Sequence, residues 1–109
     1  MASILLLESD PDVRRLLLIL LGDLGHAAAA LEREEDVPAG TDLLILDPTS
    51  RIYLEQARRA RDANPGLPVV CMSFLQEEGR FLTTGGPLVH LQKPFTADEL
   101  DAAIGLALA

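Results

Sequence analysis

The chain has 109 residues, of which 49% are hydrophobic, and this predicts one domain with a single core. Its formal net charge of −8 argues against nucleic acid or an anionic membrane surface as a direct partner. No basic segment typical of a signal peptide precedes the first apolar residues, and the longest apolar run, residues 16–21, is too short to span a bilayer. We therefore expect a cytoplasmic protein. Its single cysteine, Cys71, lies in an apolar run and is expected to be a buried thiol rather than a nucleophile.

The first quarter of the chain predicts a strand followed by a helix. Residues 3–7 are continuously aliphatic, as in a strand buried on both faces of a parallel sheet. Asp10 then suits the N-cap of a helix, with Pro11 in its first position, and the helix is expected to end at Gly25. Its apolar face at helical spacing is predicted to enter the core, and comprises Val13, Leu16, Leu17, Leu20, Leu21 and Leu24.

The middle of the chain contains the most sharply defined predicted strand. Residues 26–31 predict a short, alanine-rich strand, and the polar segment 32–40 leaves room for a turn rather than a full helix. Four aliphatic residues then stand between Asp42 and Asp47, which is typical of a strand inside a parallel sheet. Pro48 follows directly and cannot donate to a sheet ladder, so the strand is expected to end at Asp47.

The remaining elements alternate between helix and strand. The predicted elements are a helix at 53–63, a strand at 68–74, a short helix at 76–82, a strand at 88–91 and a last helix opened by the capping box of residues 96–99. This order predicts an α/β fold in which helices flank a five-stranded parallel sheet in a doubly wound sandwich, with the second helix short or missing.

Chemically active side chains follow the strands of this predicted sheet. In an open parallel sheet the carboxyl ends of the strands form the edge where ligands bind, so Glu8, Asp47, Ser73 and Lys93 should lie near one another. An ammonium beside a carboxylate neutralises the charge of a transferred phosphoryl group, and the hydroxyl of Ser73 can donate to one of its oxygens. Acidic groups beside Asp47 can hold Mg²⁺, and an aspartate nucleophile would form an acyl phosphate.

At this point the chain resembles the receiver domain of two-component response regulators over essentially its whole length. The resemblance rests on residues 4–14 (ILLLESDPDVR), 42–47 (DLLILD) and 68–73 (PVVCMS), and on Lys93-Pro94-Phe95 before a helix. It implies a flavodoxin-like fold in which Asp47 accepts a phosphoryl group from a histidine kinase, with Ser73 and Lys93 in contact with that group. It further implies a cis peptide bond between Lys93 and Pro94, which proline makes accessible.

The resemblance also implies a metal site and a switch position. Mg²⁺ would be held by the carboxylates of Glu8, Asp10 and Asp47 and by the backbone carbonyl of Thr49. The alternative role of Asp10 is that of helix cap. His90 stands where the family often has a switch tyrosine or phenylalanine, and is either a half-buried strand histidine or a pH sensor.

Three residues depart from the family pattern near this site. Ser9 replaces the acidic residue that usually binds Mg²⁺, Pro48 removes a backbone donor, and the ring of Phe74 could crowd the pocket where a small residue is usual. We therefore favour a degenerate pseudo-receiver that acts as a protein-interaction module, with Mg²⁺ binding weak or absent. The alternative is a working phosphoacceptor at Asp47, and in both cases the partner is a histidine kinase or a downstream signalling protein.

Two further hypotheses remain from the sequence. The segment from Asp47 to Thr49, with Ser73 and Lys93, also resembles the haloacid-dehalogenase phosphatase pattern. The acidic pair that this family carries after the lysine is missing, so we expect that the protein is not an enzyme. Leu18 and Ile19 extend the apolar surface of the first helix and are either scattered surface residues or a self-association patch of a homodimer.

Overall fold

The computed structural model describes residues 2–31, 35–74 and 85–109. Its elements along the chain are β1 (Ser3–Leu7), α1 (Pro11–Asp23), β2 (Ala27–Ala30), β3 (Leu43–Leu46), α2 (Arg51–Ala63), β4 (Val69–Ser73), β5 (Leu88–Gln92) and α3 (Ala97–Leu108). All five predicted strands are present, and the predicted helix at 76–82 lies outside the described residues.

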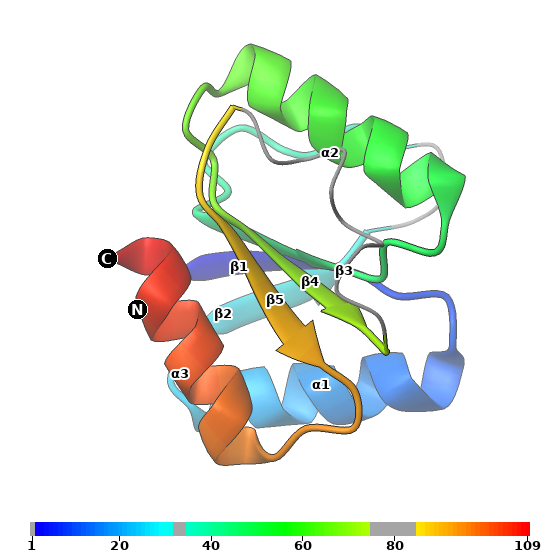
Figure 1. Ribbon diagram of the computed structural model, residues 1–109, viewed down its shortest axis with the longest axis vertical. Helices are drawn as coiled ribbons and strands as arrows, with labels where there is room; N and C mark the ends of the chain where they lie inside the picture. The colour runs from blue at the N-terminus through cyan, green and yellow to red at the C-terminus, as the bar shows by residue number, and fades with distance from the viewer. Residues whose placement is uncertain (1, 32–34, 75–84) are drawn as a thin grey trace.

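The five strands form one parallel sheet in the order β2-β1-β3-β4-β5. Helices α1 and α3 cover one face of the sheet and α2 covers the other, as Figure 1 shows. This is the predicted doubly wound α/β sandwich. Because every strand runs in the same direction, the residues that follow β1, β3, β4 and β5 all lie at one edge of the sheet.

The sheet separates two apolar cores. On the α1/α3 face, alternate strand residues pack beneath the two helices, among them Leu6, Ile45 and Met72. On the α2 face, the other strand residues pack with Tyr53 and the buried Cys71 thiol. The thiol of Cys71 is buried, as predicted, and burial raises its pKa to about 12, so it is protonated at neutral pH.

The helix starts follow the capping residues of the sequence. The side chain of Asp10 caps α1 with Pro11 in the first turn, and Thr96 with Glu99 forms the predicted capping box of α3. Helix α2 begins at Arg51 rather than at residue 53, because the hydroxyl of Ser50 accepts a hydrogen bond from a backbone amide of the first turn. The prediction for this helix start was therefore two residues late.

The buried face of α1 is rotated relative to the prediction. Leu17 and Leu21 are buried, but Leu16, predicted to be core, has 56% of its surface exposed, whereas Leu18 packs partly against the core. The uninterrupted apolar run at 16–21 allows several helix orientations, and α1 packs chiefly over β2, which selects one of them. Ile19 is 55% exposed, so the solvent-facing apolar pair on this helix is Leu16 and Ile19.

The segment between β2 and β3 contains no helix among its described residues 35–42, as the polar sequence predicted. Ala27 and Ala29 of β2 consequently remain exposed on the α2 side of the sheet. Helix α2 is fixed at its far end by Arg61, which is 5% exposed and donates from Nε to the carbonyl of Leu67 at 3.0 Å and from Nη2 to that of Pro87 at 2.5 Å. None of the described helices has the length and apolar character needed to cross a bilayer.

Candidate functional site

Asp47 stands directly after β3, whose four residues are fully buried. Its backbone amide still bonds to the carbonyl of Leu7, so the main chain is held by the sheet at the point where the side chain leaves it. One carboxylate oxygen, Oδ1, accepts hydrogen bonds from the backbone amide of Thr49 at 3.0 Å and from its hydroxyl at 2.7 Å. These two bonds across a tight turn fix the orientation of the carboxylate.

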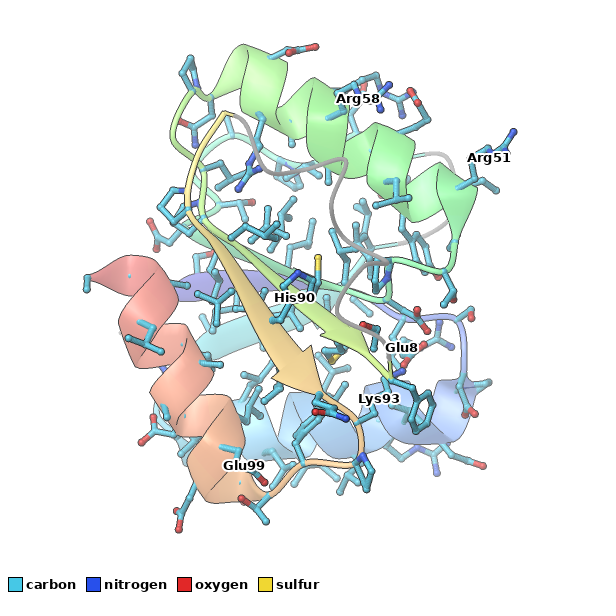
Figure 2. The ribbon with its side chains drawn as sticks, in the orientation of Figure 1. Glu8, Arg51, Arg58, His90, Lys93 and Glu99 are labelled. Carbon is cyan, nitrogen blue, oxygen red and sulfur yellow. The ribbon has the colours of Figure 1, made fainter. Side chains whose placement is uncertain are left out.

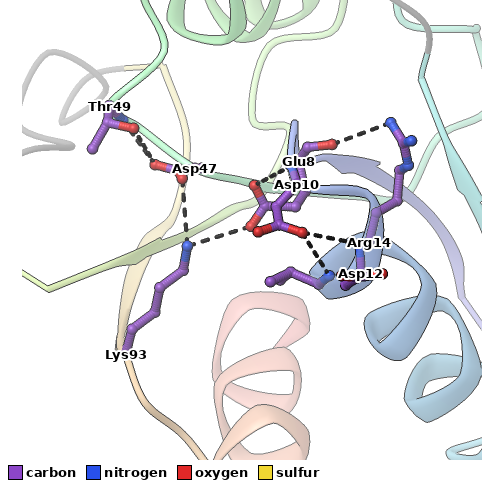
Figure 3. A network of polar contacts seen from close by, with 8 residues as sticks. Glu8, Asp10, Asp12, Arg14, Asp47, Thr49 and Lys93 are labelled. Atoms are coloured by element: carbon purple, nitrogen blue, oxygen red, sulfur yellow. Dashed lines mark hydrogen bonds and ion pairs between the residues drawn. The ribbon is translucent and has the colours of Figure 1, made fainter.

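Lys93 lies directly after β5, at the same edge of the sheet. Its backbone amide bonds to the carbonyl of Ser73, and its peptide bond to Pro94 is cis, as the resemblance implied. Its Nζ lies 3.3 Å from Oε1 of Glu8 and 3.4 Å from Oδ2 of Asp47. Figure 3 shows the ammonium between the two carboxylates, which confirms the predicted meeting of residues from β1, β3 and β5.

Glu8 is the most deeply buried charge at this edge, with a side chain 2% exposed. Its second oxygen accepts a bond from the amide of Asp10 at 3.4 Å, and its backbone carbonyl accepts one from Nη1 of Arg14 at 3.5 Å. A buried carboxylate needs such partners, because an unpaired buried charge is strongly destabilising. Lys93 is therefore the cation that makes this position tolerable for Glu8.

The carboxylate of Asp10 does not join this ion cluster. Its Oδ1 accepts the amides of Asp12 at 2.9 Å and Val13 at 3.3 Å, which confirms its role as the cap of α1. Ser9, between Glu8 and Asp10, is exposed. The described residues contain no group of three or more His, Cys, Asp or Glu side chains placed to hold a metal ion.

The pKa of Asp47 reflects opposing influences. Burial acts to raise it, but the hydrogen bonds from the hydroxyl and amide of Thr49 and the charge of Lys93 outweigh burial, so the pKa of Asp47 lies below its usual value. Asp47 is consequently an anion at neutral pH, which is the state required of a nucleophile and also of an ion-pair partner.

The other predicted site residues lie on or next to β4 and β5. Ser73 is the last residue of β4 and is 4% exposed. In the sheet register it pairs with Gln92, the residue that precedes Lys93. His90 is a half-buried residue of β5 opposite Cys71, and its Nδ1 is buried without a hydrogen-bond partner among the described residues. A hollow of about 30 Å³, the size of one water, is lined in part by Ser73 and His90. The ring of Phe74 is 67% exposed, so most of it lies in solvent rather than in the site.

Comparisons with solved structures identify this architecture. NtrX from Brucella abortus, solved with ADP, matches with a TM-score of 0.82 and 25% identity, over 98% of this chain and 26% of NtrX. A response regulator receiver domain protein from Clostridium thermocellum matches with a TM-score of 0.80 and 20% identity, over 99% of this chain and 94% of that protein. This chain has the fold of response regulator receiver domains.

A third match concerns the metal. The receiver domain of the sensor histidine kinase PA1611 from Pseudomonas aeruginosa, solved with a magnesium ion in its active-site cleft, matches with a TM-score of 0.73 and 20% identity, over 98% of this chain and 97% of that domain. No protein-family model matches the sequence of the present receiver domain, and no curated protein does so either. The receiver domain described here spans about a quarter of the length of NtrX.

The donor set of this receiver domain fits Mg²⁺ only in part. Glu8 and Asp47 offer hard carboxylate oxygens, and Mg²⁺ commonly uses one or two carboxylates together with waters. However, both carboxylates already share the ammonium of Lys93, and the side chain of Asp10 is committed to the helix cap. A cation at this edge must therefore share or replace an ion pair that the protein makes by itself.

Sequence reasoning missed one side chain of this receiver site. Thr49 was considered only for its backbone carbonyl, whereas its hydroxyl makes the shortest side-chain hydrogen bond to Asp47 among the described residues. The sequence does contain a signal for this bond. In Asp47-Pro48-Thr49 an aspartate stands two residues before a threonine, and an aspartate carboxylate in a turn often accepts a hydrogen bond from the residue two positions further along the chain.

Proposed function

We propose that this receiver domain is a degenerate, pseudo-receiver module of two-component signalling, in which protein interaction outweighs phosphorylation at Asp47. The observation that carries this proposal is the ion cluster of Glu8, Lys93 and Asp47. The protein neutralises its own acidic edge with an internal cation, and Ser9 supplies no third carboxylate. Weak or absent Mg²⁺ binding follows from that arrangement.

The residues that would hold Mg²⁺ are Glu8 and Asp47, with the backbone carbonyl of Thr49 as a third donor. When bound, the ion would supply charge neutralisation for a phosphoryl group on Asp47. The magnesium ion in the active-site cleft of the receiver domain from Pseudomonas aeruginosa supports Mg²⁺ binding by this fold in general. Lys93 and Ser73 would contact the same phosphoryl oxygens, and His90 would occupy the switch position.

The second candidate function is a working phosphoacceptor modified by a histidine kinase. It is favoured by the lowered pKa of Asp47, which keeps the carboxylate anionic, and by the 3.4 Å separation between its Oδ2 and Nζ of Lys93. In either case the domain acts in the cytoplasm through a histidine kinase or a downstream signalling protein, and has no turnover of its own.

One experiment separates these two functions. The protein is incubated with a small phosphodonor such as acetyl phosphate at millimolar Mg²⁺, and intact mass is measured with the Asp47→Asn variant as control. The degenerate receiver shows little or no added phosphoryl mass. Stoichiometric labelling that disappears in Asp47→Asn would overturn the proposal and establish the working phosphoacceptor.

A second experiment examines the enzymatic alternative and the metal. Hydrolysis of a generic phosphate ester, abolished by Asp47→Asn, would revive the haloacid-dehalogenase phosphatase hypothesis. An ¹⁵N-HSQC titration with Mg²⁺ and then beryllofluoride, a mimic of the aspartyl phosphate, is expected to leave the amides around Asp47, Ser73 and Lys93 nearly unmoved. Large saturating shifts at millimolar Mg²⁺ would contradict weak binding.

A further inference from the structure

The outward face of α2 concentrates the positive charge of this acidic protein. Four of the nine basic residues of the protein lie on this 13-residue helix, whereas only two of the seventeen acidic residues do. One of the four, Arg61, is buried, and the other three are exposed. Arg51 and Arg58 project outward from the helix, away from the sheet, in Figure 2.

The exposed charges on α2 alternate in sign along one stripe. Successive members are four, three and four residues apart, which places them on a single face of a helix. All of them are exposed. The stripe consists of Arg51, Glu55, Arg58 and Asp62.

This stripe is complementary to itself when two helices lie antiparallel. About a two-fold axis between residues 56 and 57, Arg51 of one copy faces Asp62 of the second copy. The same axis places Glu55 opposite Arg58. Each of these pairs occurs twice, so the contact contains four opposite-charge pairs and no like-charge pair.

The first turn of α2 opposes the helix dipole. A helix favours anions in its first turn, but α2 begins with Arg51 and has no acidic residue there; in its last turn the buried Arg61 favours the dipole and the exposed Asp62 opposes it. An antiparallel partner reverses this penalty, because its carboxyl end and Asp62 lie beside the first turn. Departures from local rules of this kind occur at functional sites.

An apolar element lies beside the charged stripe. Ile52 is 37% exposed, and it borders an open hollow of about 390 Å³ that is also lined by Arg51, Glu55 and Arg59. In the antiparallel arrangement Ile52 approaches the alkyl stem of Arg59 of the second copy. Burial of this apolar contact would add to the charge pairs.

The ion pairs that α2 makes within the chain leave its charges free to exchange partners. Arg58 lies 3.0 Å from Glu55 with side chains 53% and 50% exposed, and Arg59 lies 3.5 Å from Asp36, which is 87% exposed. Exposed pairs of this kind contribute little to stability. We propose that the outward face of α2 binds a second copy of this chain, with the two helices antiparallel about a two-fold axis.

The contact is small and electrostatic. A helix of 13 residues is about 20 Å long, so the interface belongs to the weak, transient class. Each copy also carries a net charge of −8, so two copies repel each other at long range. At about 0.1 M salt the Debye length is about 10 Å, so this long-range repulsion is screened, whereas the charge pairs at contact distance are screened much less. The inference does not depend on the chemistry of Asp47.

Sedimentation equilibrium up to about 1 mM protein tests the proposal, since that range detects millimolar dissociation constants. The weight-average mass is expected to rise above 11.7 kDa with concentration at about 0.1 M salt and to return toward 11.7 kDa at about 1 M salt. Arg58→Glu turns two attractive pairs into repulsive ones and is expected to weaken association at least tenfold. Glu55→Arg is expected to do the same.

The charge-swapped double variant Glu55→Arg/Arg58→Glu restores every pair and is expected to recover association. Arg15→Glu, an exposed change of the same kind on α1, is the matched control and is expected to leave association unchanged. A mass of 11.7 kDa at every concentration would overturn the proposal. So would association that survives Arg58→Glu, or a folded double variant, checked by circular dichroism, that remains monomeric.

Discussion

Replacing Lys93 by methionine removes the shared cation of the site while keeping a side chain of similar length. Glu8, 2% exposed, and Asp47, 17% exposed, would then face each other as two carboxylates without a counter-ion. Loss of one partner from a buried pair costs about 3–5 kcal/mol, whereas loss of an exposed pair costs about 0–1 kcal/mol. With the ammonium itself 18% exposed, we expect a loss of about 2–4 kcal/mol in the free energy of unfolding at neutral pH.

Urea denaturation followed by circular dichroism measures this loss. At a slope of about 1–3 kcal/mol per molar urea, the midpoint is expected to fall by about 1–3 M. In the native protein the pKa of Asp47 is lowered, so its stabilising contribution is present above the pKa of the unfolded carboxyl and is lost as pH falls through the folded value. Without Lys93 the pKa of Asp47 rises, and the deficit of the variant should therefore shrink between about pH 7 and pH 4.

Two companion variants show whether the effect comes from the ion cluster. Arg58→Met removes a cation whose ion pair is half exposed, and it should change stability by less than about 0.5 kcal/mol. Glu8→Gln/Lys93→Met removes a buried charge together with its partner and should recover part of the loss. A loss below about 1 kcal/mol for Lys93→Met, or one that does not vary with pH, would refute the view of Lys93 as the cation that holds this edge together.

Three further outcomes follow from the described contacts. Thr49→Val removes the hydroxyl bond, so the pKa of Asp47 should rise in a ¹³C carboxyl titration, and stability should fall less on acidification; an unchanged pKa counts against the bond. Arg61→Met should cost about 2–3 kcal/mol in the free energy of unfolding measured in urea, because the buried bond to the carbonyl of Leu67 and the partly buried bond to that of Pro87 are lost; a neutral result would contradict that account. Leu16→Lys/Ile19→Glu, on the exposed apolar pair of α1, is expected to leave the sedimentation mass unchanged at every concentration, because the proposed self-contact lies on α2; a lowered mass would place the contact on α1 instead.

The sequence predicted the sheet and the meeting of Glu8, Asp47 and Lys93 for one physical reason. Buried aliphatic runs identify parallel strands, and parallel strands bring the residues that follow them to a common edge. Neither inference needs side-chain detail. The same reasoning therefore succeeded across a separation of 85 residues between Glu8 and Lys93.

The errors arose where the sequence permits several local solutions. A run of six apolar residues in α1 does not fix the orientation of the helix, so Leu16 and Leu18 were assigned to the wrong sides. The start of α2 depended on the hydroxyl of Ser50, and the orientation of Asp47 depended on that of Thr49. Hydroxyl groups can bond to several nearby backbone groups, and the geometry of the turn decides which bond forms.

The ion cluster at the sheet edge also has a consequence for the order in which the domain is completed. Its two carboxylates come from the first and third strands along the chain, but its cation comes from the fifth and is the only lysine of the sequence. During synthesis, the acidic groups therefore exist before the charge that neutralises them. The two carboxylates gain their shared counter-ion only when β5 joins the sheet, so the electrostatic state of Glu8 and Asp47 reports whether the last strand has docked.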